Sequence, residues 1–257
     1  MKVINKYHFV FDTGKKNKKV KNYILKKFTN YKPQLSQVIV IFGGDGFMLK
    51  SLKKYQRFNK PFYGINRGTF GFLMNKYKPS DIKKNISNAK QISISPLHMK
   101  AYTKTNKTYS AIAVNEVSLL RQTKQTASIK ISCGKKILIK KLVCDGILVS
   151  TPAGSTAYNL SVGGPILSLN SKKLAVTAIS PFRPRRWRGK IVPSSSLIKI
   201  QNLDTEKRSI SAVADNIEIR NIKSILIKIN NKIKFKLLYN KNYSLAKKIK
   251  TEQNMSR

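Results

Sequence analysis

One stretch of sequence decides the fold of the first third of the chain: Val38-Ile39-Val40-Ile41-Phe42-Gly43-Gly44-Asp45-Gly46. Five apolar residues that run directly into glycine are typical of a strand buried on both faces, as in a parallel sheet. Apolar residues at helical spacing follow in Phe47 to Arg57, and Phe62 to Ile65 is a second short apolar run. His8 to Phe11 and the helical pattern of Lys19 to Thr29 come before the stretch. This alternation predicts a parallel sheet with helices on its faces.

From Met99 onward, short alternating segments replace the helical patterns. Such segments predict strands, and we expect these at Ser110 to Val114, Ser128 to Ser132, Lys136 to Lys140, Leu197 to Ile200, Ile210 to Val213, Ile217 to Ile219, Ile225 to Ile229 and Phe235 to Leu238. The predicted fold class is therefore α/β plus β, in two domains. Residues 1–95 form the α/β domain, completed by a C-terminal helix over 243–257, and residues 96–242 form the β-rich domain.

The charge of the chain is strongly positive: 52 Lys and Arg oppose 10 Asp and Glu, which gives a net charge of +42. Nucleic acid, anionic membranes and phosphorylated metabolites are all attracted by such a field. The basic residues are spread along the chain and form no single tail or helical stripe. We therefore favour compositional drift over a dedicated role, and expect no specific nucleic-acid partner.

The cysteines and apolar runs point to an ordinary cytoplasmic protein. Cys133 and Cys144 are too few for a disulfide framework and lack the spacing of a metal knuckle, so we predict no metal site made of protein ligands. The longest apolar runs, such as Val38 to Phe42, are far shorter than the roughly 20 residues that span a bilayer. The N-terminus lacks the apolar core of a signal peptide, so we expect no membrane partner.

The glycine cluster at 43–46 lies where a parallel strand ends, which is where α/β sheets bind ligands. Its glycines let the backbone approach a phosphate chain, and the helix that follows offers free N–H groups to negative charge. Asp45 would repel phosphate unless it accepts a proton or helps to hold a metal ion. A tight turn with an aspartate side-chain hydrogen bond is the alternative interpretation, and both stay open at this point.

A second glycine loop, Asn66-Arg67-Gly68-Thr69-Phe70-Gly71-Phe72-Leu73, follows the next predicted strand. Two such loops at one edge of a sheet suggest a shared crevice, although ordinary strand-to-helix turns would look similar. Asn115-Glu116 ends another apolar segment, and a carboxylate there suits the hydroxyl pair of a ribose. Taken alone, that pair is more typical of a solvated strand end.

The richest segment runs from Asp145 to Tyr158: an acid, an apolar strand, and then a small-residue loop dense in hydroxyl groups. Such a loop can wrap a nucleotide closely, with Thr156 supplying a hydroxyl group and Tyr158 an aromatic ring. A long turn between two core strands is the structural alternative, but long ordered loops are more often functional.

Together these motifs resemble the NAD kinase family, whose order is GGDG, NxGxxGFL, NE and DGxxxSTPxGSTAY. The resemblance spans about residues 38 to 220. Its first motif is shared with diacylglycerol and sphingosine kinases, whereas the stretch from Asp145 to Ile166 is specific to the family. Ser180 to Trp187 is similar to a variant typical of proteobacterial members.

The resemblance implies a Rossmann-like N-terminal domain, a β-rich, sandwich-like C-terminal domain, and a site between them that neighbouring subunits of a dimer or tetramer complete. The implied reaction transfers the terminal phosphoryl group of ATP to the 2′-hydroxyl of the adenosine ribose of NAD, which gives NADP. A divalent ion, Mg²⁺, would arrive with ATP. The glycine loops do not decide between ATP and polyphosphate as the donor.

Residue roles follow from the matching positions. Asp45 matches the family's catalytic proton acceptor, Asn115 and Glu116 match residues that hold the adenosine half of NAD, and Asp145 matches a contact to the nicotinamide end, commonly reached from an adjacent subunit. The full NAD-binding set comprises Asp45, Gly46, Asn115, Glu116, Asp145, Ala153, Thr156, Ala157, Tyr158, Asn159, Leu160 and Ser161. The residues expected near the ATP phosphates are Gly43, Gly44 and Gly68.

The sequence departs from the family at Asp215-Asn216, where many members carry Asp-Gly. Two alternative functions remain at this stage. A lipid kinase of the diacylglycerol or sphingosine type would suit the positive charge, but the hydroxyl-rich loop from Thr151 to Tyr158 suits a dinucleotide better. A non-enzymatic basic nucleic-acid-binding module would leave the acids beside the glycine loops unexplained.

Overall fold

The computed structural model describes residues 4–68, 71–76 and 82–240 and divides the chain into two compact units. The α/β unit comprises Met1–Ile94 and Ile233–Arg257, and the β unit comprises Ser95–Lys232. We propose that these two units are the domains of the protein. The helix predicted over 243–257 lies outside the described residues.

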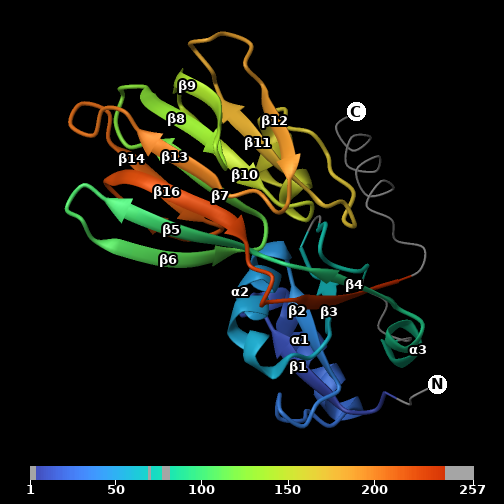
Figure 1. The fold of residues 1–257 in the computed structure, drawn as a ribbon. Helices are drawn as coiled ribbons and strands as arrows, with labels where there is room; N and C mark the ends of the chain where they lie inside the picture. The colour runs from blue at the N-terminus through green and yellow to red at the C-terminus, as the bar shows by residue number, and fades with distance from the viewer. Residues whose placement is uncertain (1–3, 69–70, 77–81, 241–257) are drawn as a thin grey trace, which may run out of the picture. The chain divides into compact units, whose positions relative to one another are not determined.

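The described part of the α/β unit contains one five-stranded sheet in the order β1-β2-β3-β17-β4 (Figure 1). Its elements are β1 (Tyr7–Phe11), α1 (Lys15–Lys27), β2 (Val38–Gly43), α2 (Asp45–Tyr55), η1 (Gln56–Phe58), β3 (Phe62–Asn66), α3 (Ile82–Ser87), β4 (Lys90–Ile94) and β17 (Phe235–Tyr239). The strands β1, β2, β3 and β17 pair in parallel, and β4 pairs antiparallel to β17.

Strand β17 corrects one part of the predicted organisation. The sequence pattern assigned Phe235 to Leu238 to the β-rich domain, but β17 lies between β3 and β4 in the sheet of the α/β unit. An alternating apolar pattern shows that a segment is a strand, and it carries no information about the sheet in which the strand pairs.

Helices cover both faces of this sheet. Ile24 of α1 and Ile82 of α3 pack into one cluster with Val40 of β2, which identifies one covered face. Residues of β2 alternate in direction, so the neighbouring Ile41 faces the other way. Gly64 is the register partner of Ile41, and a side chain there would meet Met48 of α2, so α2 covers the second face. A strand buried on both sides needs the continuous apolar run that the sequence shows.

The β unit contains two six-stranded antiparallel sheets within the described residues. The first, here called the β10 sheet, has the order β12-β11-β10-β7-β14-β15, and the second, the β13 sheet, has the order β6-β5-β16-β13-β8-β9. The bounds of the elements are β5 (Leu97–Thr103), β6 (Thr108–Ala113), β7 (Glu116–Arg121), β8 (Ala127–Cys133), β9 (Lys136–Cys144), β10 (Gly146–Ser150), η3 (Gly154–Thr156), α4 (Tyr158–Ser161), β11 (Lys173–Ile179), β12 (Gly189–Pro193), β13 (Ile198–Asn202), β14 (Ile210–Ala214), β15 (Ile217–Ile219) and β16 (Ile222–Ile229).

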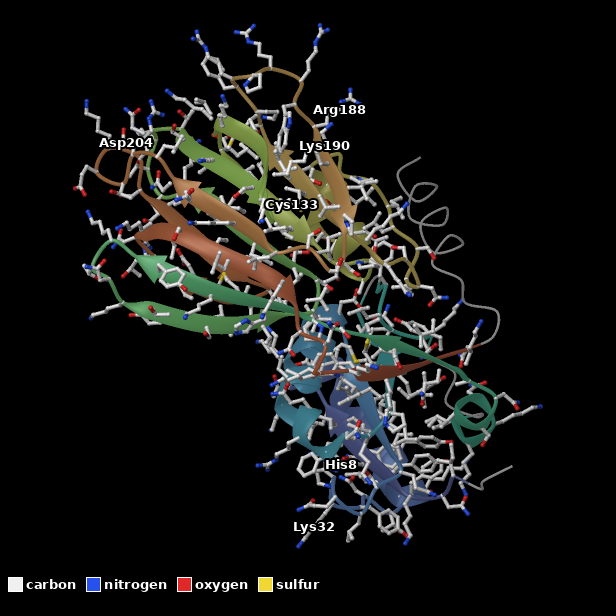
Figure 2. The ribbon with its side chains drawn as sticks, viewed as in Figure 1. His8, Lys32, Cys133, Arg188, Lys190 and Asp204 are labelled. Atoms are coloured by element: carbon white, nitrogen blue, oxygen red, sulfur yellow. The ribbon has the colours of Figure 1, made fainter. Side chains whose placement is uncertain are left out.

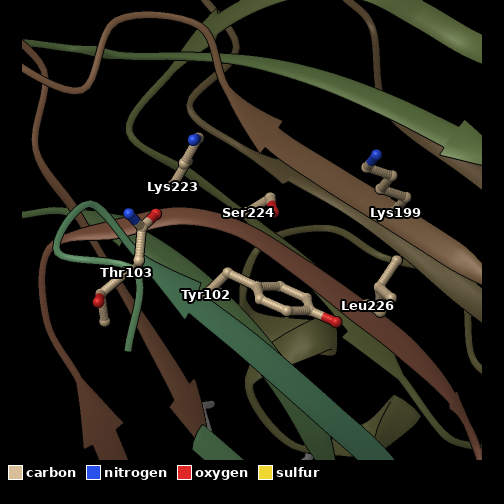
Figure 3. Close-up of a pocket in the computed structure, with 7 residues that line it drawn as sticks. Tyr102, Thr103, Lys199, Lys223, Ser224 and Leu226 are labelled. Carbon is tan, nitrogen blue, oxygen red and sulfur yellow. The ribbon is translucent and has the colours of Figure 1, made fainter. Parts of the chain in front are cut away.

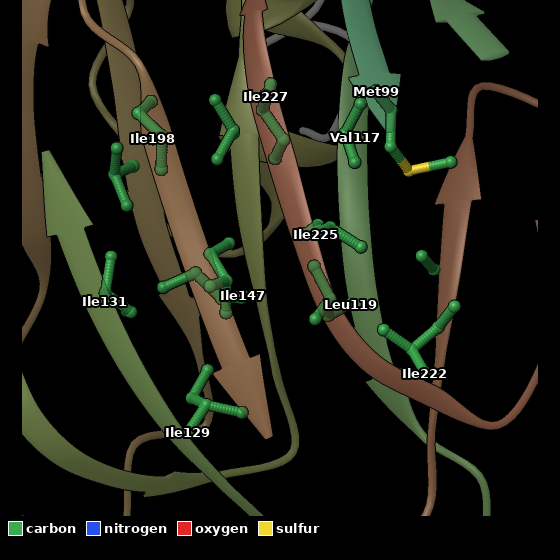
Figure 4. Packing of buried hydrophobic residues seen from close by; sticks show 14 of the residues in the cluster. Met99, Val117, Leu119, Ile129, Ile131, Ile147, Ile198, Ile222, Ile225 and Ile227 are labelled. Carbon is green, nitrogen blue, oxygen red and sulfur yellow. The ribbon is translucent and has the colours of Figure 1, made fainter. Parts of the chain in front are cut away.

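One apolar core joins the two sheets face to face (Figure 4). Leu119 and Ile147 of the β10 sheet share a cluster with Ile131, Ile198 and Ile225 of the β13 sheet, and all five side chains are buried. Burial of each such side chain contributes about 1.5–3 kcal/mol to folding. This packing is that of a β-sandwich and confirms the predicted fold class.

The long connection between β10 and β11 contains the short elements η3 and α4 and no further strand among its described residues. In the described part of the chain, every helix is too short or too polar to cross a bilayer.

Candidate functional site

The two glycine loops of the α/β unit meet at the ends of neighbouring parallel strands. The loop after β2 leads into α2, and the loop after β3 starts with Asn66. The Arg67 N–H donates to the carbonyl oxygen of Gly43 at 2.8 Å. A side chain placed on Gly68 would lie 4.0 Å from the Cα atom of Gly44. The structure thus brings Gly43, Gly44 and Gly68 together.

Asp45 is the first residue of α2, and its carboxylate reaches across to the second loop. It accepts the Phe72 N–H at 2.7 Å and the Leu73 N–H at 3.1 Å, one on each oxygen. A side chain at Gly71 would approach the carboxylate to 3.0 Å. These bonds fix the direction of the Asp45 carboxylate. The carboxylate therefore lies between the two loops and holds the second loop by two hydrogen bonds.

The neighbours of Asp45 include a buried tyrosine, Tyr239, and an exposed glycine, Gly46. Burial raises the pKa of the Tyr239 hydroxyl, and the negative charge of Asp45 raises it further. Gly46 is exposed, with nothing within 4 Å of the position that a Cβ atom would take. The N-cap of α2 is Gly44, which makes no side-chain cap, so the N–H groups of the first turn are suited to an anion.

In the β unit, Asn115 and Glu116 lie at the start of β7 and are tied to the loop after β10. The Thr151 hydroxyl donates to the carbonyl oxygen of Val114 at 2.7 Å, and the Thr151 N–H donates to that of Asn115 at 2.9 Å. The same hydroxyl accepts the Gly154 N–H at 3.1 Å. A Cβ atom on Gly154 would lie 2.2 Å from the Asn115 carbonyl oxygen, so the two segments approach more closely than any side chain allows.

Three buried polar atoms at this place have no hydrogen-bond partner among the described residues: Asn115 Oδ1, Glu116 Oε2 and Thr156 Oγ1. Buried polar groups in folded proteins are almost always paired, so an unpaired group needs an explanation. Burial raises the pKa of the Glu116 carboxyl to about 7, and the nearby charge of Asp215 also raises it. A ligand that offers hydroxyl and amide groups would satisfy all three atoms.

Asp215 supports this segment from behind. Its carboxylate accepts the N–H groups of Val114 and Asn115, each at 2.9 Å. Asp215 has a φ of 52°, in the left-handed region, and Asn216 does not have a positive φ. The position at which many relatives carry glycine therefore does not require glycine here. Sequence reasoning did not identify Asp215 as an anchor. The signal for it was that the chain has only 10 Asp and Glu, so each carboxylate is a candidate for a defined role.

Asp145 lies at the junction of β9 and β10, with its side chain 38% exposed. Its carboxylate accepts the Arg121 Nε–H at 2.6 Å, and its carbonyl oxygen accepts the Arg121 N–H at 3.0 Å. Sequence reasoning did not single out Arg121, because the pairing of β7 with β10 that places it opposite Asp145 is not local. Gly146 is packed so closely that a Cβ atom would lie 2.2 Å from the Leu119 carbonyl oxygen.

Asn159 is fully buried and its side chain is used within the protein. Its amide nitrogen donates to the carbonyl oxygens of Ser155 at 3.2 Å and Pro165 at 3.0 Å, and its amide oxygen accepts the Thr177 hydroxyl at 2.7 Å. The Asn159 side chain therefore holds the loop against β11. A side chain on Gly164 would collide with Asn159 at 2.3 Å, so this glycine permits the arrangement.

The other predicted residues of the loop differ in exposure. Tyr158 is 38% exposed, which leaves its ring free to contact a ligand, and Ser161 is also exposed. Ala153 is buried, while Ala157 and Leu160 are half-buried. Within the β unit, the structure therefore brings Asn115 and Glu116 together with the loop from Ala153 to Ser161, whereas Asp145 lies at the other end of β10.

No group of three or more His, Cys, Asp or Glu side chains in the described ranges could enclose a metal ion. Mg²⁺ keeps several water molecules and is commonly held by one or two carboxylates together with substrate phosphates.

Comparisons with known proteins agree on one family. The chain matches the model of the ATP-NAD kinase N-terminal domain over residues 1–91 and that of the ATP-NAD kinase C-terminal domain over residues 114–235. It is 47% identical over 232 residues to an NAD kinase of Zymomonas mobilis, covering 89% of this chain and 90% of the relative. It is 42% identical over 246 residues to an NAD kinase of Brucella suis, covering 96% of each.

Two solved structures are similar in fold. The first is a yeast NADH kinase complexed with NADH, with a TM-score of 0.79, 20% sequence identity, and coverage of 97% of this chain and 87% of the other. The second is an NAD kinase from Archaeoglobus fulgidus in complex with ATP, with a TM-score of 0.73, 22% identity, and coverage of 96% and 99%. At these identities the two structures show a shared fold.

The family models cover both parts of the chain, and relatives more than 40% identical extend over nearly all of it. The lipid-kinase and non-enzymatic alternatives gain no support from these matches. Since both the motifs and the fold agree with the matches, the chain belongs to the NAD kinase family.

Proposed function

We propose that this protein transfers the terminal phosphoryl group of ATP to the 2′-hydroxyl of the adenosine ribose of NAD. The relatives named above are NAD kinases, and the similar solved structures contain NADH and ATP. The observation that carries the proposal is the Asp45 carboxylate, which is held between two glycine loops at the end of a parallel sheet.

Asp45 acts as the proton acceptor. A carboxylate with an ordinary pKa of about 3.9 cannot remove a proton from a sugar hydroxyl in the ground state. Phosphoryl transfer has a loose transition state in which positioning and charge neutralisation lower the barrier. Asp45 therefore orients the 2′-hydroxyl and takes its proton late, as the bond to phosphorus forms. The fixed direction of the carboxylate supports this role.

Asn115, Glu116 and Thr156 bind the adenosine half of NAD. Their unpaired oxygen atoms offer acceptors to ribose hydroxyl and adenine amino groups. The exposed ring of Tyr158 and the loop from Ala153 to Ser161 complete the binding surface. Gly43, Gly44 and Gly68 allow the ATP phosphates to approach the backbone and the first turn of α2.

Mg²⁺ fits as a companion of ATP, because the described residues offer isolated carboxylates and no cage. Bound with the nucleotide, the ion neutralises phosphate charge. Polyphosphate remains an alternative donor, because backbone donors at a glycine loop recognise phosphate and not the nucleoside.

We further propose a cytoplasmic homo-oligomer. The half-exposed Asp145 carboxylate, paired with Arg121, is accessible to a ligand bound by a neighbouring copy. This arrangement suits the contact to the nicotinamide end that the sequence resemblance implies.

Replacement of the proton acceptor tests the proposal. Asp45→Asn is expected to lower kcat at least about 10²-fold, within the usual contribution of a general base. The amide can accept only one of the two N–H groups, so a modest loss of stability is also expected. The measurement is NADP formation from ATP, Mg²⁺ and NAD, together with the dissociation constant of NAD by calorimetry and thermal unfolding.

A matched control is Asp12→Asn. Asp12 follows the neighbouring strand β1 and accepts one backbone N–H, from Thr13 at 2.8 Å. We expect turnover within about twofold of the unmodified enzyme, as for a surface substitution. Near-normal turnover of Asp45→Asn would contradict the catalytic role. A loss of NAD affinity as large as the loss of kcat would instead show that Asp45 only anchors the second loop.

A further inference from the structure

The strands of the β13 sheet carry lysines and no acidic residue. Their lysines are Lys100, Lys130, Lys136, Lys140, Lys141, Lys199, Lys223 and Lys228. In the sequence these residues are scattered over more than half of the β unit, which makes them look like compositional drift. The sheet brings them side by side.

The register of the sheet places several of these lysines on its outer face. Ile198 and Ile200 of β13 lie in the core, so Lys199 between them points outward. Lys199 is the register partner of Leu226 in β16, and Leu226 is in turn the partner of Lys100 in β5. A row of outward side chains therefore crosses three strands.

A second row runs parallel to the first. Tyr102 of β5 faces Ser224 of β16, Ser224 faces Gln201 of β13, and Gln201 faces Lys130 of β8. The row thus presents one aromatic ring, two uncharged polar groups and one cation. The Lys100 ammonium group lies 5.3 Å from the centre of the Tyr102 ring, which joins the two rows.

Two hollows lie on this face. The first, with a volume of about 330 Å³, is lined by Tyr102, Lys199, Lys223 and Leu226, among others (Figure 3). In the close-up the Tyr102 ring lies below Ser224, and Lys199 and Lys223 come from the neighbouring strands β13 and β16. The lysine side chains are exposed and form no ion pair with another described residue.

The second hollow, of about 740 Å³, lies beside β8 and β9 and is lined by Ser128, Lys141, Lys207 and Arg208, among others. Its single carboxylate is Asp204, which lies 3.9 Å from the Arg208 Nε atom, in the connection after β13 at one end of the unit (Figure 2). Lys141 and Lys207 make no ion pair within the described ranges, so the hollow keeps a net positive charge.

We propose that the outer face of the β13 sheet, from Lys223 to Lys141, binds single-stranded nucleic acid without sequence preference, in addition to the kinase activity. Nonspecific single-strand binding sites combine a basic groove that follows the phosphates with aromatic rings on which bases stack. The lysine rows and the Tyr102 ring provide both elements. A second copy of the chain that used this face would bring like charges together. Exposed apolar side chains at this sheet, such as Ile137 of β9 and Leu203 beside the second hollow, would let an anionic bilayer compete for the face, and vesicle binding is therefore one arm of the test.

The test measures binding of a fluorescein-labelled 20-nucleotide oligouridine to the full chain by fluorescence anisotropy, at 50 to 300 mM salt. The triple variant Lys130→Gln, Lys199→Gln, Lys223→Gln removes three charges from the face. We expect at least about tenfold weaker binding at 100 mM salt and a salt slope smaller by about two, because each phosphate contact on a single strand contributes about 0.7 to the slope.

The control triple is Lys18→Gln, Lys21→Gln, Lys26→Gln on the exposed face of α1, which lowers the net charge by the same three units. Its affinity for the oligonucleotide should stay within about twofold. Tyr102→Leu should weaken binding about fivefold or more, since stacking on one ring contributes about 1–3 kcal/mol. Both triples should keep kcat and KM, and each single lysine variant is measured in case the triple folds poorly.

Several outcomes would overturn the proposal. Equal losses in the two triples would assign the binding to net charge alone, and no binding by the unmodified protein at 100 mM salt would remove it. Binding of phosphatidylserine vesicles, but not of the oligonucleotide, through these lysines would assign the face to a membrane. A change of oligomeric state in the sheet triple, measured by sedimentation, would assign it to a second copy.

Discussion

The two sheets of the β unit have the same size and share one core, yet their outer sides differ in charge. The strands of the β10 sheet contain Glu116 and Glu218, and Asp145 and Asp215 lie in the turns beside them. The strands of the β13 sheet contain eight lysines and no acid. Packing constrains only the inner positions of each strand, so the outer positions are free to serve different ligands.

Several of the few acids of the chain thus lie in or beside the β10 sheet. Two carboxylates beside the strands of the β10 sheet have defined partners, since Asp215 accepts two N–H groups and Asp145 pairs with Arg121, whereas Glu116 Oε2 is buried without a partner among the described residues. In the β13 sheet the eight lysines form no ion pair with another described residue. The first arrangement suits a fixed site for one ligand, as proposed above for NAD, and the second suits the polyanion surface proposed for the β13 sheet.

The largest expected effect comes from adding a methyl group where the loop after β10 touches the segment before β7. Gly154→Ala places a Cβ atom 2.2 Å from the Asn115 carbonyl oxygen, so the backbone of one segment has to move. We expect a loss of about 3 kcal/mol in the free energy of unfolding and at least about a tenfold rise in KM for NAD. Urea unfolding and steady-state kinetics measure the two effects.

Gly14→Ala is the matched control, since nothing lies within 4 Å of its added Cβ atom and its φ of −58° suits any residue. Its stability and KM should stay near those of the unmodified protein. If Gly154→Ala also behaved in this way, the close approach would have no part in building the NAD site.

A pH effect of intermediate size tests the buried carboxyl of the β10 sheet. Burial raises the pKa of Glu116 from 4.5 to about 7, so the folded protein holds this proton more tightly than the unfolded chain does. The stability contributed by the neutral carboxyl is complete below about pH 4.5 and is lost as the pH rises through 7. Relative to Glu116→Gln, the unmodified protein should lose about 2 kcal/mol between these pH values.

Urea unfolding at pH 4.5, 6 and 8 in the absence of NAD measures this difference, and parallel curves for the two proteins would contradict it. Bound NAD adds a second readout. Hydroxyl donors favour the charged carboxylate, so KM for NAD should fall as the pH rises through 7 in the unmodified enzyme. The Glu116→Gln variant should lack this pH dependence.

The smallest expected effect concerns the turn between β14 and β15. Asn216→Gly restores the residue that many relatives carry, but the left-handed backbone here lies at Asp215 and not at Asn216. No strain is relieved, so the free energy of unfolding should change by less than about 0.5 kcal/mol, as for a neutral surface substitution. The same limit on the activation barrier keeps kcat within about twofold. A stabilisation above about 1 kcal/mol, measured by thermal unfolding, would show that the asparagine is strained.

Much of the site was predictable because its parts are local. The apolar run Val38 to Phe42 predicted a buried strand, and the glycines after it predicted a ligand loop beside Asp45. The structure confirms that the loops after β2 and β3 meet. The partners that fix the site were not predictable, because Asp215 reaches Val114 and Asn115 across about a hundred residues of chain. Their contact depends on the pairing of β14 with β7.

The sequence alone determined the alternation of strand and helix, the family motifs and the placement of Asp45 in a glycine loop after a buried strand, because each depends on residues close together in the chain. Only the tertiary structure decided that β17 joins the α/β sheet and that Asn159 is used internally. It also gathered lysines between positions 100 and 228 on one face. The physical reason is that strand pairing joins distant segments, and the register of each pair decides which side chains become neighbours.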